Sequence, residues 1–211
     1  MKKYVAEFLG TFGLVFCGTG AIVINQHTNG VVGHMGIAIT FGAIVTAMIY
    51  CFGNISGAHL NPAVTLGLAI NRFFSGREVI PYLLAQIAGA FAASFLLKVL
   101  FPLNINLGTT LPSGSDLQSF ILEIVLTFFL MLTILFTARG NEGVKPLAGL
   151  IIGTVVLLEA MFAGPVCGAS MNPARSLAPA LVSGHVQSLW VYLIAPIFGS
   201  LSASFTYRFF S

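Results

Sequence analysis

Charged side chains are scarce in this sequence. Nine of its 211 residues are Lys or Arg and six are Asp or Glu, a charged fraction of 7%, whereas a typical soluble domain has about 25%. The apolar fraction is 57%, so too few polar side chains are available to cover the surface of a soluble monomer. A disordered chain is excluded as well, because disorder needs low hydropathy and high charge. The composition therefore indicates an integral membrane protein.

Two further absences narrow the function. The net charge is +3, but no basic stripe is present, so no nucleic-acid partner is expected. The three cysteines, Cys17, Cys51 and Cys167, form no close pair and no metal-ligand spacing, and we interpret them as small apolar packing residues. Because no metal cluster or pairing of nucleophile and base is apparent, we expect no cofactor, no metal and no enzymatic activity.

Long apolar runs fill most of the chain. A helix needs about 20 apolar residues to cross the hydrocarbon core of a bilayer, and the alternating strands of an outer-membrane barrel are absent. The first run is too long for a signal peptide, so we expect an uncleaved span. The sequence predicts an all-α membrane protein with six transmembrane helices. They cover Tyr4–Ile24, His34–Gly53, Val79–Leu100, Leu117–Ala138, Pro146–Ala163 and Gln187–Phe209.

The basic residues predict the orientation of these spans. If both termini are cytoplasmic, seven basic residues lie in inner segments and two in outer ones, which satisfies the positive-inside rule. The inner residues are Lys2, Lys3, Arg72, Arg77, Arg139, Lys145 and Arg208, and the outer ones are Lys98 and Arg175. We therefore expect a multi-pass protein of the inner or plasma membrane with cytoplasmic termini.

Two apolar segments are too short to span the membrane. They are Ile55–Ile70 and Val166–Val182, and each contains Asn-Pro-Ala, beginning at Asn61 and at Asn172, 111 residues apart (172 − 61). In each, Asn at a cap position, Pro in the first turn and a following apolar run predict a helix start. Each helix N-terminus carries about half a positive elementary charge. Non-helical backbone at membrane depth survives only when it is buried in protein or lines a water-filled cavity.

The short segments belong to an internal duplication. Glu7 and Glu123 repeat at a similar offset of 116 residues (123 − 7). The chain is therefore expected to be a single transmembrane domain built of two repeats, residues 1–105 and 116–211. Because each repeat has three spans, the second enters the membrane from the opposite side, which makes the repeats inverted. The two short segments then enter from opposite faces and meet near the midplane.

The recurrence of Asn-Pro-Ala in this arrangement is specific, whereas one copy would indicate only a turn. Over its full length the sequence resembles the aquaporin or major intrinsic protein family. The resemblance implies a passive transmembrane channel in the lipid bilayer, with six helices and two re-entrant half-helices, assembled as a homotetramer with one pore per protomer. It rests on Gly57-Ala58-His59-Leu60-Asn61-Pro62-Ala63-Val64-Thr65 and Gly168-Ala169-Ser170-Met171-Asn172-Pro173-Ala174-Arg175-Ser176.

The resemblance places both motifs at the pore centre, with Asn61, Pro62, Ala63, Asn172, Pro173 and Ala174. The two asparagine amides can donate to one water oxygen, which interrupts a proton wire, and the paired helix ends repel protons and cations. The alternative is that both asparagines are helix caps only.

An intramembrane arginine is costly, and the family places Arg175 at the outer constriction. Its alternative is a surface arginine that snorkels to the interface.

Two intramembrane glutamates and one histidine flank the motifs. Glu7 and Glu123 are expected to accept hydrogen bonds from the re-entrant loops, whose backbone otherwise lacks partners in the bilayer. The alternative is a proton relay, as in a proton-coupled transporter of small solutes. His59 is expected to brace the first loop and to contribute to the pore lining.

The resemblance also implies a selectivity filter of four residues, which we call the filter positions. Counted back from the motifs they are Phe41 (61 − 20), Ala160 (172 − 12), Ala169 (172 − 3) and Arg175. Strict water channels have histidine at the second position, so alanine predicts a wider and less polar constriction. Glycerol facilitators have aspartate where this chain has Ser176, and tryptophan at the first position.

A narrower resemblance is to the nodulin-like intrinsic proteins of plants and their bacterial relatives. It rests on the run from Ala163 to Leu177 and implies passage of water, glycerol and neutral metalloid hydroxides. A strict water channel with an unusual filter remains an alternative. Glu159, beside Ala160, is left open: it either joins a hydrogen-bond network away from the pore or faces the pore and adds acceptors.

Overall fold

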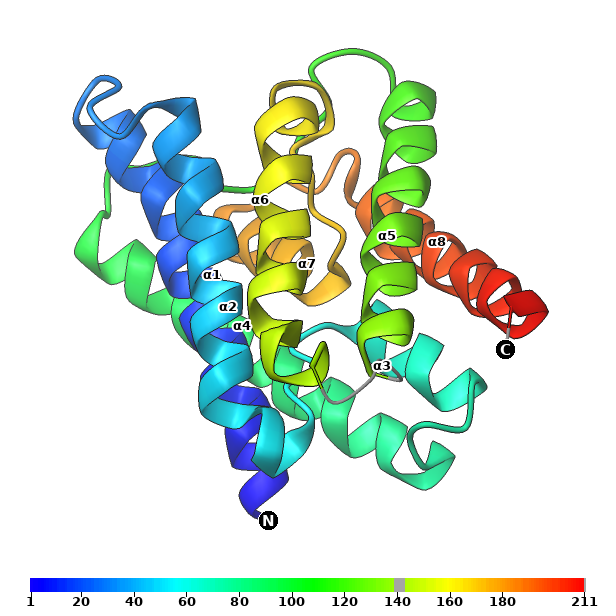
Figure 1. Cartoon of the computed structure of the whole chain (residues 1–211). Helices are drawn as coiled ribbons and strands as arrows, with labels where there is room; N and C mark the ends of the chain where they lie inside the picture. The colour runs from blue at the N-terminus through cyan, green and yellow to red at the C-terminus, as the bar shows by residue number, and fades with distance from the viewer. Residues whose placement is uncertain (139–142, 211) are drawn as a thin grey trace.

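The structure, a computed structural model, describes residues 1–138 and 143–210. All regular elements in these ranges are helical (Figure 1). Six helices are long and apolar enough to cross a membrane: α1 (Lys2–His27), α2 (Gly33–Ser56), α4 (Val79–Leu100), α5 (Asp116–Ala138), α6 (Ala148–Cys167) and α8 (Leu189–Phe210). Two short helices are α3 (Pro62–Ile70) and α7 (Pro173–Ser183), and 3-10 turns at Gly76–Glu78 and Lys145–Leu147 precede α4 and α6. The predicted all-α architecture with six spans and two short segments is confirmed.

The two short segments were predicted to start two residues too early, although their helices begin after Asn61 and Asn172 as predicted. Ile55 still belongs to α2 and Val166 to α6, because each long helix continues until a glycine in the left-handed region ends it. These glycines are Gly57 (φ 86°) and Gly168 (φ 82°), and glycine adopts this conformation at low cost. A loop without regular secondary structure follows each glycine, and the short helices begin only at the prolines.

The helices pack in matching sets. α1 packs against α2 and α4, and α5 packs in the same way against α6 and α8. Each short helix crosses to the other set, since α3 packs against α8 and α7 against α4, while α2 and α6 pack against each other. The chain is thus two similar units of three long helices and one short helix, interlocked through their short helices (Figure 1).

Glycine sets the closest helix contacts, and the contacts repeat. A Cβ on Gly89 of α4 would collide with the Phe8 carbonyl oxygen of α1, and one on Gly199 of α8 would collide with the Ile124 carbonyl oxygen of α5. Between α2 and α6, a Cβ on Gly42 or on Gly153 would lie 2.5 Å from the carbonyl oxygen of the other glycine. Small residues allow such approach in lipid, where the hydrophobic effect does not drive helix association.

Both termini lie at one end of the bundle, and Lys98 lies at the other. An even number of spans puts both termini at one end, in the lower half of Figure 1. At the opposite end, Lys98 Nζ donates to the Val182 carbonyl oxygen at 2.9 Å, which is a favourable place for a cation because it lies at the C-terminus of α7. Arg139, predicted to be an inner residue, lies outside the described residues.

Replacing Gly89 by leucine should impair folding, because the new side chain would meet backbone atoms of α1 that cannot move aside. Overpacking of this kind costs about 1–3 kcal/mol or more. We expect a lower melting temperature and less monodisperse protein in detergent, with the same result for Gly199→Leu. Gly89→Ala should already lower the stability, and Gly53→Ala is its matched control, since a Cβ on Gly53 would have its nearest neighbour atom 4.0 Å away. Equal stability of G89A and G53A would contradict this packing.

Candidate functional site

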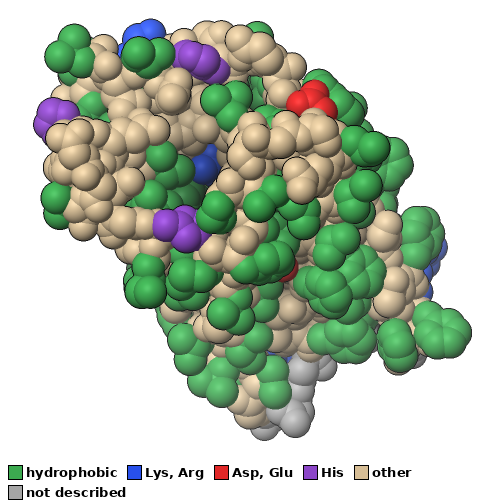
Figure 2. All heavy atoms as spheres, turned by 90° about the horizontal axis from the view of Figure 1, so that it is seen from above, with side chains coloured by type: hydrophobic (Ala, Val, Ile, Leu, Met, Phe, Trp, Pro, Cys, Tyr) green, Lys and Arg blue, Asp and Glu red, His purple; other side chains and the backbone are tan. Residues whose placement is uncertain are grey.

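A cavity of about 510 Å³ lies between the two units. It is lined by α2, α5 and α6 and by the two loops that precede α3 and α7. Figure 2, viewed from the end opposite the N-terminus, shows the surface hollowed here, with a basic side chain visible in the hollow. Both motif asparagines and His59 line the cavity, and so do all four filter positions, Phe41, Ala160, Ala169 and Arg175. The structure therefore brings these predicted residues together around one space.

The loops that precede the short helices have an unusual backbone. Ala58 (φ 47°) and Leu60 (φ 53°) adopt the left-handed conformation in the first loop, and so do Ala169 (φ 40°) and Met171 (φ 53°) in the second. This conformation is uncommon for residues with a side chain and costs free energy. Such loops persist only when other groups hold their N–H and C=O groups in place.

Glu7 of α1 supplies acceptors for the first loop. Its Oε1 accepts from the backbone N–H of His59 at 2.9 Å and from Ser56 Oγ at 2.7 Å. Its Oε2 accepts from the backbone N–H of Leu60 at 2.8 Å and from Gln86 Nε2 at 2.8 Å. The carboxylate is fully buried, and four donors compensate for the loss of water around it.

Glu123 of α5 does the same for the second loop. Its two oxygens accept from the backbone N–H groups of Ser170 and Met171, both at 2.7 Å. These residues match His59 and Leu60 of the first loop at the 111-residue offset. The positions equivalent to the two side-chain donors around Glu7 hold Cys167 and Pro196, so the second carboxylate has fewer polar neighbours than the first.

The motif asparagines cap the short helices. Asn61 Oδ1 accepts from the Ala63 N–H at 2.9 Å. Asn172 Oδ1 accepts from the N–H groups of Ala174 at 3.0 Å and Arg175 at 3.3 Å. Both asparagines have an extended backbone, as an N-cap requires. Pro62, Ala63, Pro173 and Ala174 are buried in the first turns behind them.

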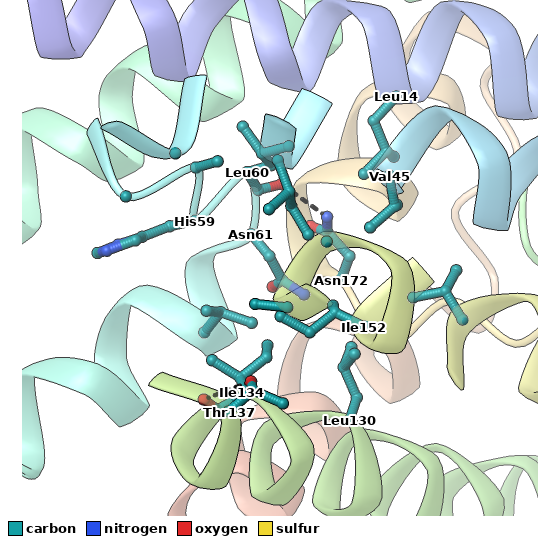
Figure 3. Close-up of a pocket in the computed structure, with 18 of the residues that line it drawn as sticks. Leu14, Val45, His59, Leu60, Asn61, Leu130, Ile134, Thr137, Ile152 and Asn172 are labelled. Atoms are coloured by element: carbon teal, nitrogen blue, oxygen red, sulfur yellow. Dashed lines mark hydrogen bonds between the residues drawn. The ribbon is translucent and has the colours of Figure 1, made fainter. Parts of the chain in front are cut away.

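The same amides also connect the two loops. Asn61 Nδ2 donates to the Met171 carbonyl oxygen at 2.7 Å, and Asn172 Nδ2 donates to the Leu60 carbonyl oxygen at 2.8 Å. Figure 3 shows Asn61, Asn172 and Leu60 close together in the pocket. A side-chain amide has two N–H donors, so each asparagine retains one after this exchange. The sequence alone suggested that both N–H groups of each amide would be available to water in the pore.

Arg175 lies at one end of the cavity, only 2% exposed. Its Nη1 donates to the Gly108 carbonyl oxygen at 3.0 Å, and its Cζ lies 5.1 Å from the centre of the Phe41 ring. Gly108 has φ 69°, and a Cβ there would come within 2.8 Å of the Thr19 side chain. Sequence reasoning missed Gly108, because its role depends on Arg175 and Thr19, which are distant in the sequence.

Gly18 is a second residue that sequence reasoning missed. It lies on α1 behind Phe41, and a Cβ at this position would overlap the Phe41 ring. Glycine therefore lets the ring lie back against α1. Ala160 and Ala169 also line the cavity and present only methyl groups, so the filter positions combine an aromatic ring, a cation and two small apolar side chains.

His59 and Glu159 occupy different surroundings. His59 Nδ1 is 3.1 Å from Thr65 Oγ1, and its ring packs 4.6 Å from the Phe74 ring and 5.0 Å from the Tyr82 ring, measured between centroids.

Glu159 is 6% exposed, and its Oε2 has no hydrogen-bond partner among the described residues. It is not among the described residues that line the cavity, so it faces away from the space that Ala160 lines.

Known proteins match this chain over almost its whole length. Aquaporin NIP1-1 of Oryza sativa subsp. japonica is 45% identical over 209 residues, which cover 99% of this chain and 74% of the relative. Nodulin-26 of Glycine max is 42% identical over 209 residues, which cover 99% of this chain and 77% of the relative. The X-ray structure of the aquaglyceroporin from Plasmodium falciparum has a TM-score of 0.86 and 29% identity, and the match covers 98% of this chain and 94% of that one.

The family model described as major intrinsic protein matches residues 1–207. Its members are channels, not enzymes. The resemblance drawn from the two Asn-Pro-Ala motifs is thereby confirmed, and the apolar helices make the chain a multi-pass membrane protein. This chain belongs to the major intrinsic protein family.

Proposed function

We propose that the chain forms a passive pore for water and small uncharged solutes, including glycerol and neutral metalloid hydroxides. The observation that carries the proposal is the convergence of the four filter positions and the asparagine pair on one cavity. A solute in this cavity meets Arg175 as a donor at one end and the remaining amide N–H of each asparagine further along. Apolar side chains such as Val45, Leu130 and Ile152 line much of the rest.

Charge exclusion follows from the same groups. The short helices direct two positive N-termini toward the asparagine pair, where a cation is disfavoured. One remaining N–H on each amide is enough for the pair to donate two hydrogen bonds to a single water. That water then donates to its neighbours in the file without accepting from them, which interrupts proton transfer along the file. Arg175 adds a fixed positive charge at the filter.

The small side chains at the filter leave room for solutes larger than water. Ala160 and Ala169 leave space that a histidine or another large side chain would occupy, and Gly18 lets Phe41 lie back. The methyl groups of Ala160 and Ala169 can contact the carbon atoms of a polyol while Arg175 donates to its hydroxyl groups. A strict water channel is the second candidate, and the small side chains at two filter positions count against it.

A proton-coupled transporter is a less suitable alternative. A relay needs a carboxylate that is free to exchange protons, whereas the oxygens of Glu7 and Glu123 accept from loop N–H groups.

We also propose that the chain is a single domain of two inverted repeats, residues 1–105 and 116–211. The proposal also includes a homotetramer with a pore in each protomer, in the plasma or inner membrane with cytoplasmic termini.

The solute range can be tested in proteoliposomes by stopped-flow light scattering with glycerol, urea and boric acid. The wild-type protein should pass glycerol and boric acid faster than empty liposomes do. Ala160→His should reduce glycerol flux at least several-fold and leave water flux largely intact, because the imidazole narrows the filter. Ala195→Ser is a control, since Ala195 is buried in α8 away from the cavity lining. An unchanged ratio of glycerol to water permeability in A160H would contradict the filter assignment.

The role of Arg175 can be tested with ion and proton fluxes. Arg175→Val should raise cation or proton leak above the wild-type level, since it removes the positive charge that repels them. Arg77→Val, which removes an exposed charge, should leave the leak unchanged. Both variants are compared with wild type by a pH-sensitive dye enclosed in the vesicles. A tight ion barrier in folded R175V protein would count against the proposed role.

A further inference from the structure

A proline interrupts α6 close to the filter. Pro165 lies inside this helix, and proline has no N–H to donate to the carbonyl four residues earlier. That carbonyl belongs to Met161, the residue directly after Ala160. The helix therefore leaves one carbonyl oxygen without its usual backbone donor, at the filter residue's immediate neighbour.

A side chain from another helix supplies the missing donor. His34 Nε2 of α2 lies 2.6 Å from the Met161 carbonyl oxygen, and a carbonyl can only accept, so the ring nitrogen donates. Gly164 gives the ring room, because a Cβ at that position would lie 3.0 Å from His34 Cε1. Figure 2 shows histidine side chains on this face of the molecule, beside the hollow.

This hydrogen bond joins the two helices that carry Phe41 and Ala160. Phe41 follows His34 on α2 by two helical turns, and Ala160 precedes Met161 on α6. Gly42 and Gly153 also hold α2 and α6 close together, further from the start of α2 and the end of α6 than the His34 contact. Nearer those ends, the histidine contact is a polar link between α2 and α6 at the residue that follows Ala160.

We propose that His34 is a positioning residue that determines the solute selectivity of the filter. It replaces the N–H that Pro165 lacks, fixes the Met161 carbonyl, and so sets the distance between the filter walls on α2 and α6. Loss of the bond lets the outer part of α6 move away from α2, which widens the filter toward larger solutes. The inference rests on the proposed function, because it takes Ala160 as part of the filter.

The test measures glycerol and water permeability of full-length protein in proteoliposomes. His34→Ala should raise the ratio of glycerol to water permeability by about twofold or more, as expected for losing one hydrogen bond, while water still passes. His34→Gln should restore the wild-type ratio, because its amide N–H can donate to the same carbonyl. His185→Ala is the matched control, since His185 is another histidine at this end and bonds locally to Ser183.

A double variant tests the physical cause. Pro165→Ala returns a backbone N–H to α6, so the Met161 carbonyl regains its helical donor and no longer needs His34. In the P165A background, His34→Ala should therefore leave the permeability ratio unchanged. The same increase with and without Pro165 would overturn the inference, because it would show that His34 does not act through this carbonyl.

The remaining outcomes separate the inference from the function on which it rests. If A160H changes the ratio and folded H34A does not, the filter assignment stands and the role of His34 is wrong. If neither variant changes the ratio, the filter assignment itself fails, and the inference fails with it. If H34A raises the ratio and H34Q does not restore it, the donor role is contradicted.

Discussion

The structure depends on hydrogen bonds that hold backbone groups of two loops in place at membrane depth. Water is not available there to satisfy an exposed N–H or C=O, and each unpaired group costs several kcal/mol. Leu60 illustrates the solution, because its N–H donates to Glu7 and its C=O accepts from Asn172. Met171 is held in the same way, because its N–H donates to Glu123 and its C=O accepts from Asn61. Each loop is thus held by a glutamate of its own unit and by the asparagine of the other.

This exchange gives the motif two tasks at once. Each asparagine caps its own helix through Oδ1 and fixes the other loop through one N–H of its amide. The remaining N–H is then held in a fixed direction, which is the condition for ordering a passing water molecule. Leu60 and Met171 keep their strained left-handed backbone because both their N–H and their C=O are hydrogen-bonded.

Much of this arrangement could be predicted from local rules. Apolar runs identified the six spans, and Asn-Pro followed by apolar residues identified the short helices. The 111-residue offset then related Asn61 to Asn172. Prediction was less accurate at the ends of α2 and α6, where helix continued into Ser56 and Cys167 until a left-handed glycine, because periodicity alone does not mark where a buried helix ends.

What could not be predicted depends on partners distant in the sequence. Gly18 matters because the Phe41 ring packs on it, and Gly108 matters because its carbonyl accepts from Arg175. In the sequence His34 is only the first residue of a predicted span, since its contact with Met161 requires two packed helices and a proline. The sequence leaves the direction of Glu159 open, and the structure buries this residue outside the cavity lining of the described chain.

The most direct test of the account is to measure water and proton flux in the same wild-type proteoliposomes. Stopped-flow light scattering reports osmotic shrinkage, and an enclosed pH-sensitive dye reports proton entry. The account predicts shrinkage much faster than in empty liposomes, with a low activation energy, and proton entry no faster than in empty liposomes. Shrinkage at the rate of empty liposomes, or proton entry that accompanies the water, would contradict a pore centre formed by the two asparagines.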